Sequence, residues 1–251
     1  MGEIGTSYDA AAAAWRAGPE RMYARMAEAM AEHAPVDVAA ARVLDAGAGT
    51  GVAGDAMRRR GAGSVVAVDL ASAMLPRAPA LSTVGDLTRL PFRDGAFDLA
   101  VAAFSLNHFT DPVPPMIELR RVAGALVASS YAPEWAHPAK DAVDEVLARH
   151  GFETPEWYAV ARADANPGPG DLAGCAERAG FTEVWSDVVD VDTGMRSAVD
   201  LVAWRLGMAH TAPFVAALAP DERLRVRDEA EAVVDGMPPL VVAMVVLTAL
   251  R

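Results

Sequence analysis

The chain has 251 residues, 53% of them hydrophobic, so it can bury a substantial core and is too apolar for a disordered protein. Its 34 acidic and 22 basic residues give a formal net charge of −12, which disfavours nucleic acids and anionic membrane surfaces as partners. A single cysteine excludes a disulfide framework and a cysteine-ligated zinc site.

Two helices are predicted near the start of the sequence, followed by alternating strands and helices. Gly18-Pro19 divides the helical stretch 8–33, because proline suits the first turn of a helix. The run SVVAVD lacks polar alternation, which is typical of a strand buried on both faces. This alternation predicts a parallel sheet with helices on both faces. The strands are expected at 42–45, 64–69, up to Val84, 97–104 and 125–131, and the helices at 51–60, 72–75, 114–122 and 138–150.

The last third of the sequence departs from this alternation. Residues 155–170 contain three prolines and two glycines and are predicted to form a loop. The elements expected after it are helices at 171–179, 197–207 and 220–234 and strands at 184–191 and 240–250. The two strands bracket a predicted helical insertion over residues 193–237.

The most specific local pattern is a strand that continues into a glycine-rich turn, VLDAGAGTG over residues 43–51. Glycines let the chain turn tightly and let a ligand lie against the backbone, and the helix that follows offers unpaired N–H donors. Asp69 ends the next predicted strand, 20 residues after Gly49. Its carboxylate is suited to accept both hydroxyls of a ribose.

Two kinds of nucleotide ligand fit this turn. Residues 49–54 satisfy the dinucleotide pattern G-x-G-x-x-G, with Asp69 at the expected distance. Asp45, however, precedes the first glycine by two residues, where it would repel a pyrophosphate and attract an ammonium group. Asp86 adds a carboxylate suited to accept from an adenine amino group, and Leu70 and Leu87 are placed to enclose the purine. These residues favour a nucleoside ligand that carries an ammonium group.

Four segments together resemble the class I S-adenosylmethionine-dependent methyltransferases in order and spacing: VLDAGAGTG (43–51), VAVDLASAML (66–75), GDLTRLPFRDGAFDLAVAAFSLNHF (85–109) and IELRRV (117–122). The resemblance implies an α/β fold with a Rossmann-like, seven-stranded, mostly parallel sheet, an antiparallel last strand, helices on both faces and a small helical cap. One departure is the segment 121–124, which is shorter than the proline-glycine-glycine turn of many relatives.

The resemblance also implies S-adenosylmethionine as the cofactor. It places Asp45, Gly47, Ala48 and Gly49 at the methionine moiety, Asp69 at the ribose, Leu70 and Met74 beside adenine and ribose, Asp86 and Leu87 at adenine, and Phe104 and Ser105 near the sulfonium. Tyr8 lies in a segment similar to one that covers the cofactor, and we expect it to reach the methionine carboxylate or the sulfonium. The alternative is that Tyr8 only packs a helix.

We expect a single methyltransferase domain over residues 1–251. Its parts are an N-terminal helical cover (1–40), a cofactor-binding core (41–192), the helical insertion (193–237) and the last strand (238–251). No basic segment followed by an apolar one marks the first ten residues, and the most apolar stretch, 240–250, is shorter than the ~20 residues that cross a bilayer. A cytoplasmic protein is therefore expected, and its apolar last strand and insertion are candidates for a homodimer interface.

His108 is the catalytic candidate. It follows the predicted strand 97–104 at the carboxyl edge of the sheet, where ligands bind in open α/β folds, and imidazole suits base work near neutral pH. The alternative is that His108 orders its loop or contacts the substrate without moving a proton. Asn107 and His137 are weaker candidates, and His210 is expected at the surface. No metal-binding pattern is apparent in the sequence.

The predicted activity is methyl transfer from S-adenosylmethionine to a small organic acceptor. Trp135, Trp157 and Tyr158 either line an aromatic acceptor pocket or pack their own loop. Apolar residues dominate the insertion, which favours an apolar or aromatic acceptor and leaves the nucleophile open to oxygen, nitrogen or carbon. Two alternatives remain: a protein of the same fold that binds the cofactor without methylating, in a regulatory or cyclase-like role, and an NAD-dependent oxidoreductase.

Overall fold

The computed structural model describes residues 2–76, 81–163 and 167–251. Within these ranges seven strands form one sheet of order β3-β2-β1-β4-β5-β7-β6. Neighbouring strands from β3 to β5 pair in parallel, and β7 is antiparallel to both β5 and β6. The strands are β1 (Arg42–Ala46), β2 (Ser64–Asp69), β3 (Leu81–Val84), β4 (Phe97–Ala103), β5 (Ala123–Tyr131), β6 (Glu183–Asp192) and β7 (Val241–Leu250). This arrangement confirms the predicted fold and the antiparallel last strand.

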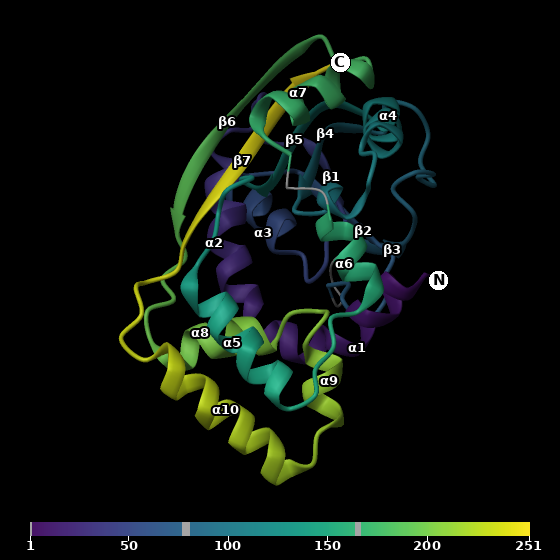
Figure 1. The fold of residues 1–251 in the computed structure, drawn as a ribbon. Coiled ribbons are helices and arrows are strands. Elements are labelled where there is room, and N and C mark those ends of the chain that lie inside the picture. The colour runs from purple at the N-terminus through teal and green to yellow at the C-terminus, as the bar shows by residue number, and fades with distance from the viewer. Residues whose placement is uncertain (1, 77–80, 164–166) are drawn as a thin grey trace.

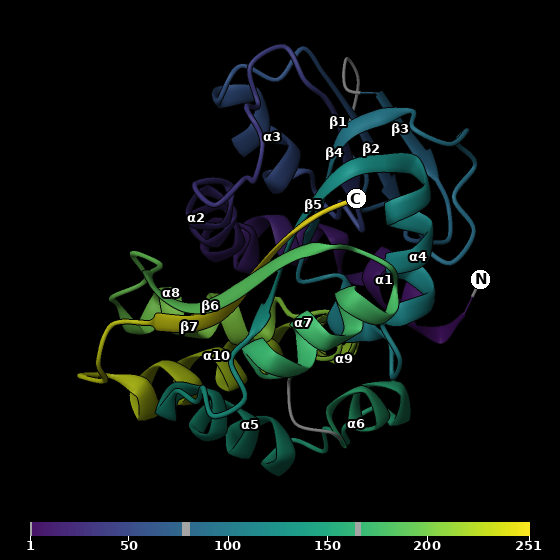
Figure 2. The ribbon, with the colours of Figure 1, turned by 90° about the horizontal axis from the view of Figure 1, so that it is seen from above.

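Helices cover both faces of the sheet and one of its ends. The helices are α1 (Glu3–Ala17), α2 (Pro19–Ala31), α3 (Val52–Arg59), α4 (Val113–Val122), α5 (Pro138–Arg149), α6 (Glu156–Ala163), α7 (Pro169–Arg178), α8 (Ala198–Leu206), α9 (Ala212–Ala217) and α10 (Pro220–Val234), with a short 3-10 turn at Leu106–His108. The sheet separates α2 and α3 from α4 and α7 (Figure 2). Helices α5, α8, α9 and α10 gather at the other end of the molecule from α4 (Figure 1).

The central strands bury both of their faces. On β1, Val43 points into a core shared with α2 and α3, and Leu44 points into the opposite core shared with α4 and α7. Both side chains are fully buried. Such strands have near-continuous apolar sequences because helices cover the sheet on both sides. The same pattern identified the strand at 64–69 from its sequence.

Two predicted loop and helix assignments are wrong. Residues 72–75 form a turn and not a helix, because the backbone N–H of Ala73 donates to Asp9 of α1 and the carbonyls of Ala73 and Met74 accept from Arg16. Within the predicted loop 155–170, α6 forms as Trp157 packs into an apolar cluster with α1 and α9. Helix α9 was also missed, since its six residues are too few for a periodic pattern.

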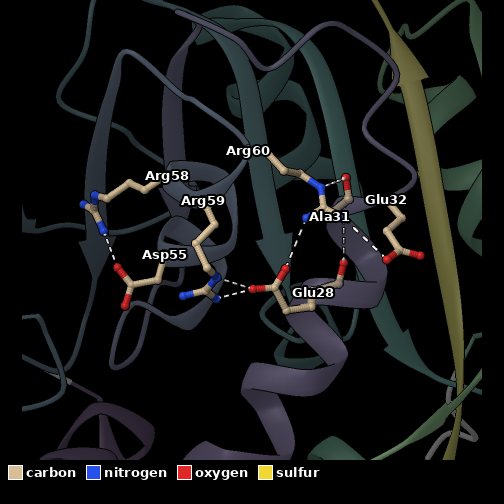
Figure 3. Close-up of polar contacts among 7 residues, drawn as sticks. All are labelled: Glu28, Ala31, Glu32, Asp55, Arg58, Arg59 and Arg60. Atoms are coloured by element: carbon tan, nitrogen blue, oxygen red, sulfur yellow. Dashed lines mark hydrogen bonds and ion pairs between the residues drawn. The ribbon is translucent and has the colours of Figure 1, made fainter.

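Ion pairs tie α2 to the end of α3, the helix that follows the glycine turn (Figure 3). Glu28 accepts from both Arg59 and Arg60, and Arg60 also donates to the carbonyl of Ala31 at 3.1 Å. Arg58 pairs within α3 with Asp55 at 2.7 Å. Exposed pairs of this kind contribute little to stability individually.

Candidate functional site

A cavity of about 190 Å³ lies at the carboxyl ends of β1, β2 and β4, where the glycine turn, the β2 end and the β4 end meet. Twelve of the thirteen predicted site residues line it: Tyr8, Asp45, Gly47, Ala48, Gly49, Asp69, Leu70, Met74, Leu87, Phe104, Ser105 and His108. Thus five separate segments of the sequence converge on one cavity, which we call the first cavity.

Glycine is required at position 47 of the turn. Its φ of +69° lies in the left-handed region, and a Cβ added there would lie 2.3 Å from Cβ of Ser105. Ser105 is itself fixed, because its hydroxyl donates to the carbonyl oxygen of Ala46 at 2.8 Å. The close approach of β1 and β4 therefore leaves no room for a side chain at this position.

Asp45 places a buried carboxyl group under the turn. The residue is 1% exposed, and its Oδ2 accepts from the backbone N–H of Gly54 at 2.8 Å. Its Oδ1 is buried and has no hydrogen-bond partner among the described residues. Burial raises the pKa of Asp45 to about 7. An acceptor without a partner beside a cavity indicates that a donor from a ligand belongs there.

Asp69 holds the turn from the neighbouring strand. Its Oδ2 accepts from the N–H of Gly49 at 2.7 Å and its Oδ1 from the N–H of Ala71 at 2.8 Å. Burial raises the pKa of Asp69 despite these two backbone donors. Each carboxylate oxygen has a second lone pair, so both oxygens can still accept a hydroxyl group from the cavity.

Asp86 is the predicted site residue that does not line the first cavity. It is exposed, and its Oδ1 accepts from the N–H and the hydroxyl of Thr88, both at 2.8 Å. Its neighbours Gly85 and Leu87 line the cavity instead. The carboxylate therefore stabilises the turn after β3. The position of an aspartate in the sequence does not distinguish this local role from contact with a ligand.

Helix α1 covers the first cavity. Ile4, Gly5, Tyr8 and Trp15 all reach it from this helix. The hydrogen bonds from Ala73 to Asp9 (2.7 Å) and from Arg16 to the carbonyls of residues 73 and 74 (2.9 and 3.0 Å) bind α1 to the loop after β2. Helix α1 is thus held directly over the cavity by polar contacts.

A second cavity, of about 50 Å³, adjoins the first. The two share Tyr8, Tyr23, Phe104 and His108 as lining residues. The hydroxyl of Tyr8 lies 3.1 Å from Nε2 of His108, so the two side chains are hydrogen-bonded at the junction. Phe104 has a φ of +53°, which is rare for a bulky residue and turns the chain between the two cavities.

The other polar and aromatic candidates divide between the second cavity and the scaffold. Asn107, Trp135, Trp157 and Tyr158 line the second cavity. His137 does not line either described cavity: its Nδ1 accepts from the N–H of Ala139 at the start of α5, and its Nε2 lies 3.1 Å from the carbonyl of Pro238. The structure favours the scaffold role for this histidine.

His210 is buried, contrary to the surface position predicted for it. It is 3% exposed, lines the second cavity and stacks on Tyr158 with ring centroids 3.7 Å apart. Helix α6, which carries Tyr158, and helix α9, which begins two residues after His210, were not predicted from the sequence. Lys140 and Arg205 of the same cavity were also missed, although Lys140 is the only lysine in the sequence, a signal that was available.

Within the described residues, no group of three His, Cys, Asp or Glu side chains is arranged to hold a metal ion. None of the helices in those ranges is long and apolar enough to cross a membrane.

Comparisons with known proteins agree with this geometry. A family model described as a methyltransferase domain matches residues 44–125. The chain is 40% identical over 124 residues to a malonyl-[acyl-carrier protein] O-methyltransferase of Halorhodospira halophila, covering 45% of this chain and 42% of that protein. It is 30% identical to a demethylmenaquinone methyltransferase of Mycobacterium sp. strain KMS, covering 63% of this chain and 75% of that protein.

Solved structures support the fold. A candidate methyltransferase from an antibiotic biosynthesis pathway of Anabaena variabilis superposes with a TM-score of 0.63, 15% identity and coverage of 90% of this chain and 97% of that one. The matches to the first three curated relatives span 42%, 43% and 48% of those proteins' own lengths. The part that matches the family model, residues 44–125, contains the glycine turn, β2, β3 and β4.

Proposed function

Because the chain belongs to the class I S-adenosylmethionine-dependent methyltransferases, we propose that it transfers a methyl group from S-adenosylmethionine to a small organic acceptor. The observation that supports this most strongly is the junction of the two cavities at His108. One cavity offers a nucleoside site with an unpartnered carboxylate oxygen, and the other offers an aromatic chamber beside it. A transfer reaction needs two such sites in contact.

In this proposal the residues of the first cavity hold the cofactor. Oδ1 of Asp45 and the buried hydroxyl of Thr50, which has no hydrogen-bond partner among the described residues, are suited to the ammonium and carboxylate groups of its methionine end. Asp69 is suited to the ribose hydroxyls. Leu70 and Leu87 are apolar surfaces for adenine. Asp86 stays outside this proposed set.

The remaining predicted residues close the cofactor site in this proposal. Gly47, Ala48 and Gly49 supply backbone at the methionine moiety, and Met74 borders the nucleoside. Phe104 and Ser105 close the cavity toward the junction, where the bound cofactor would present an activated methyl carbon. Tyr8 covers this point from α1.

We propose that His108 removes or holds the proton of the acceptor at the junction. Its Nε2 is hydrogen-bonded to the hydroxyl of Tyr8, and this contact fixes the imidazole ring at the boundary of the two cavities. A positioned base contributes roughly 10²–10⁴-fold to a rate. Tyr8 is then both a cover for the cofactor and a positioning residue for His108.

Isothermal titration tests the cofactor without knowledge of the acceptor. We expect micromolar binding of S-adenosylhomocysteine and none of NADH, because Asp45 repels a pyrophosphate. Asp69→Ala should weaken the former at least tenfold, since it leaves two ribose hydroxyls without acceptors. Asp86→Ala is the matched control and should change the affinity less than twofold. Binding of NADH alone would refute the proposal.

The reaction itself is tested with methyl-labelled S-adenosylmethionine and a panel of phenols, enols, carboxylic acids and amines. Once an acceptor that carries its proton at neutral pH is found, such as a phenol or an enol, we expect His108→Ala to lower kcat by at least 10²-fold, the effect typical of a lost base. Its affinity for S-adenosylhomocysteine should stay within a factor of three. Full activity of this variant would remove His108 from the mechanism.

A further inference from the structure

The second cavity has a definite charge. Two cations, Lys140 of α5 and Arg205 of α8, are among the residues that line it. Within residues 2–76, 81–163 and 167–251, no aspartate or glutamate lines it. Both cations come from the helices beyond the sheet and not from the cofactor-binding turn. This is notable in a chain with a net charge of −12, whose only lysine is Lys140. The cavity is thus a cationic chamber in an acidic protein.

The cations are held in place by a shared carboxylate. Arg205 is 3% exposed, and its Nε and Nη2 donate to the two oxygens of Asp144, each at 2.6 Å. Nζ of Lys140 lies 3.5 Å from the same carboxylate and 3.0 Å from Asp141, whose side chain is 73% exposed. Asp144, which is partly buried, therefore pairs with both cations. Asp141 is exposed to water, which screens its charge.

Aromatic rings form the rest of the wall. All four tyrosines of the chain and three of its five tryptophans line the second cavity. Aromatic rings can bind two different kinds of ligand: a flat conjugated molecule that stacks on them, or an ammonium ion that lies on their faces. Lys140 and Arg205 decide between them, because the two cations share one partly buried anion, Asp144, and an ammonium ligand would face the positive charge that remains.

On the basis of the proposed function, we propose that the acceptor is a flat aromatic or conjugated acid and is methylated as its oxygen anion. A phenolate, an enolate and a carboxylate share this chemistry. The acceptor oxygen forms its bond to the methyl carbon while the carbon–sulfur bond breaks and its electron pair stays on sulfur. The acidic proton has already left to His108 or to water, so the step needs no further reactant.

The charge of the cofactor supports this assignment. The sulfonium of a bound cofactor would be positive, so an anionic acceptor held by Lys140 and Arg205 would be attracted to it. An ammonium acceptor would be repelled by the sulfonium and by the positive charge that Asp144 leaves uncompensated. Desolvation in the aromatic chamber strengthens both effects, because water no longer screens the charges. The two cations thus select the acceptor before any chemistry occurs.

Three one-ring probes that differ mainly in charge test the proposal. 4-Fluorobenzoate, 4-fluorobenzamide and 4-fluorobenzylammonium are titrated into the full chain saturated with S-adenosylhomocysteine, and binding is followed by ¹⁹F NMR line widths. We expect the benzoate to bind at least tenfold more tightly than the ammonium, with the amide between them. Equal binding, tighter binding of the ammonium, or binding of none of the three at millimolar concentration would overturn the proposal.

Variants at Lys140 assign the selectivity to the chamber. Lys140→Met should remove most of the preference for the benzoate, and Lys140→Arg should restore it, since the charge is kept. Arg149→Met is the matched control on the same helix, because Arg149 pairs at the surface with Glu229 and does not line the cavity. A preference that persists in Lys140→Met, or one that disappears in Arg149→Met, would contradict the assignment.

The single lysine allows a second readout in the unmutated chain. N-hydroxysulfosuccinimidyl acetate modifies one side-chain amine, and peptide mass spectrometry follows its rate. Saturating 4-fluorobenzoate should slow acetylation of Lys140 at least threefold, and 4-fluorobenzylammonium should not. The opposite pattern of protection would overturn the proposal. Loss of S-adenosylhomocysteine binding would instead refute the proposed function, so the two failures are distinguishable.

Discussion

Replacement of Asp45 by asparagine tests the electrostatics of the cofactor site most directly. In the folded protein burial raises the pKa of this carboxyl to about 7, against an ordinary value of 3.8. The folded state therefore holds the proton more tightly than the unfolded chain. Stability from this group is fully present below pH 4, decreases as the pH rises toward 7, and is constant above that.

The magnitude follows from the difference between the two pKa values. About three units correspond to an upper bound of roughly 4 kcal/mol, at about 1.4 kcal/mol per unit. The Asp45→Asn amide keeps an oxygen for the N–H of Gly54 and cannot ionise. We expect the free energy of unfolding of the variant, relative to the wild type, to increase between pH 4 and 7 by a large part of this amount.

Urea unfolding of the ligand-free protein at several pH values from 4 to 8 measures this difference. Asp86→Asn is the control, because Asp86 is exposed and does not line the first cavity. Cofactor affinity should change with pH in the direction opposite to wild-type stability. An ammonium ligand prefers the ionised carboxylate, so the affinity of the wild type for S-adenosylhomocysteine should rise from pH 6 to 8. A stability difference between Asp45→Asn and wild type that does not depend on pH would refute the reasoning.

The remaining predictions concern the turn and its cover. Gly47→Ala should lower the melting temperature by several degrees and abolish S-adenosylhomocysteine binding, and Ser105→Gly in the same chain should restore part of both, since it removes the Cβ only 2.3 Å away. Arg16→Ala should raise the dissociation rate of S-adenosylhomocysteine severalfold in stopped-flow fluorescence, because it frees α1 from the loop after β2; an unchanged rate would contradict the role of α1 as a cover. Arg59→Ala should cost less than about 1 kcal/mol in urea unfolding, as an exposed ion pair.

The sequence alone determined the sheet and the position of the glycine turn. Strands such as 64–69 are continuous apolar runs, and the turn at 47–51 needs glycine for a left-handed backbone, so both are local properties of the chain. The positions of the Asp45 and Asp69 carboxylates could be predicted for the same reason, since each residue lies at the carboxyl end of a strand.

Only the tertiary structure decided what surrounds that turn. Residues 72–75 form a turn because they are hydrogen-bonded to α1, and α6 and α9 form because they pack against α1. The cations of that cavity, Lys140 and Arg205, are 65 positions apart and meet only because α5 packs on α8. Contacts of this kind depend on long-range packing and leave no periodic pattern in the sequence. The first cavity was therefore predictable, whereas for the second the sequence offered Trp135, Trp157 and Tyr158 as candidates and missed the two cations.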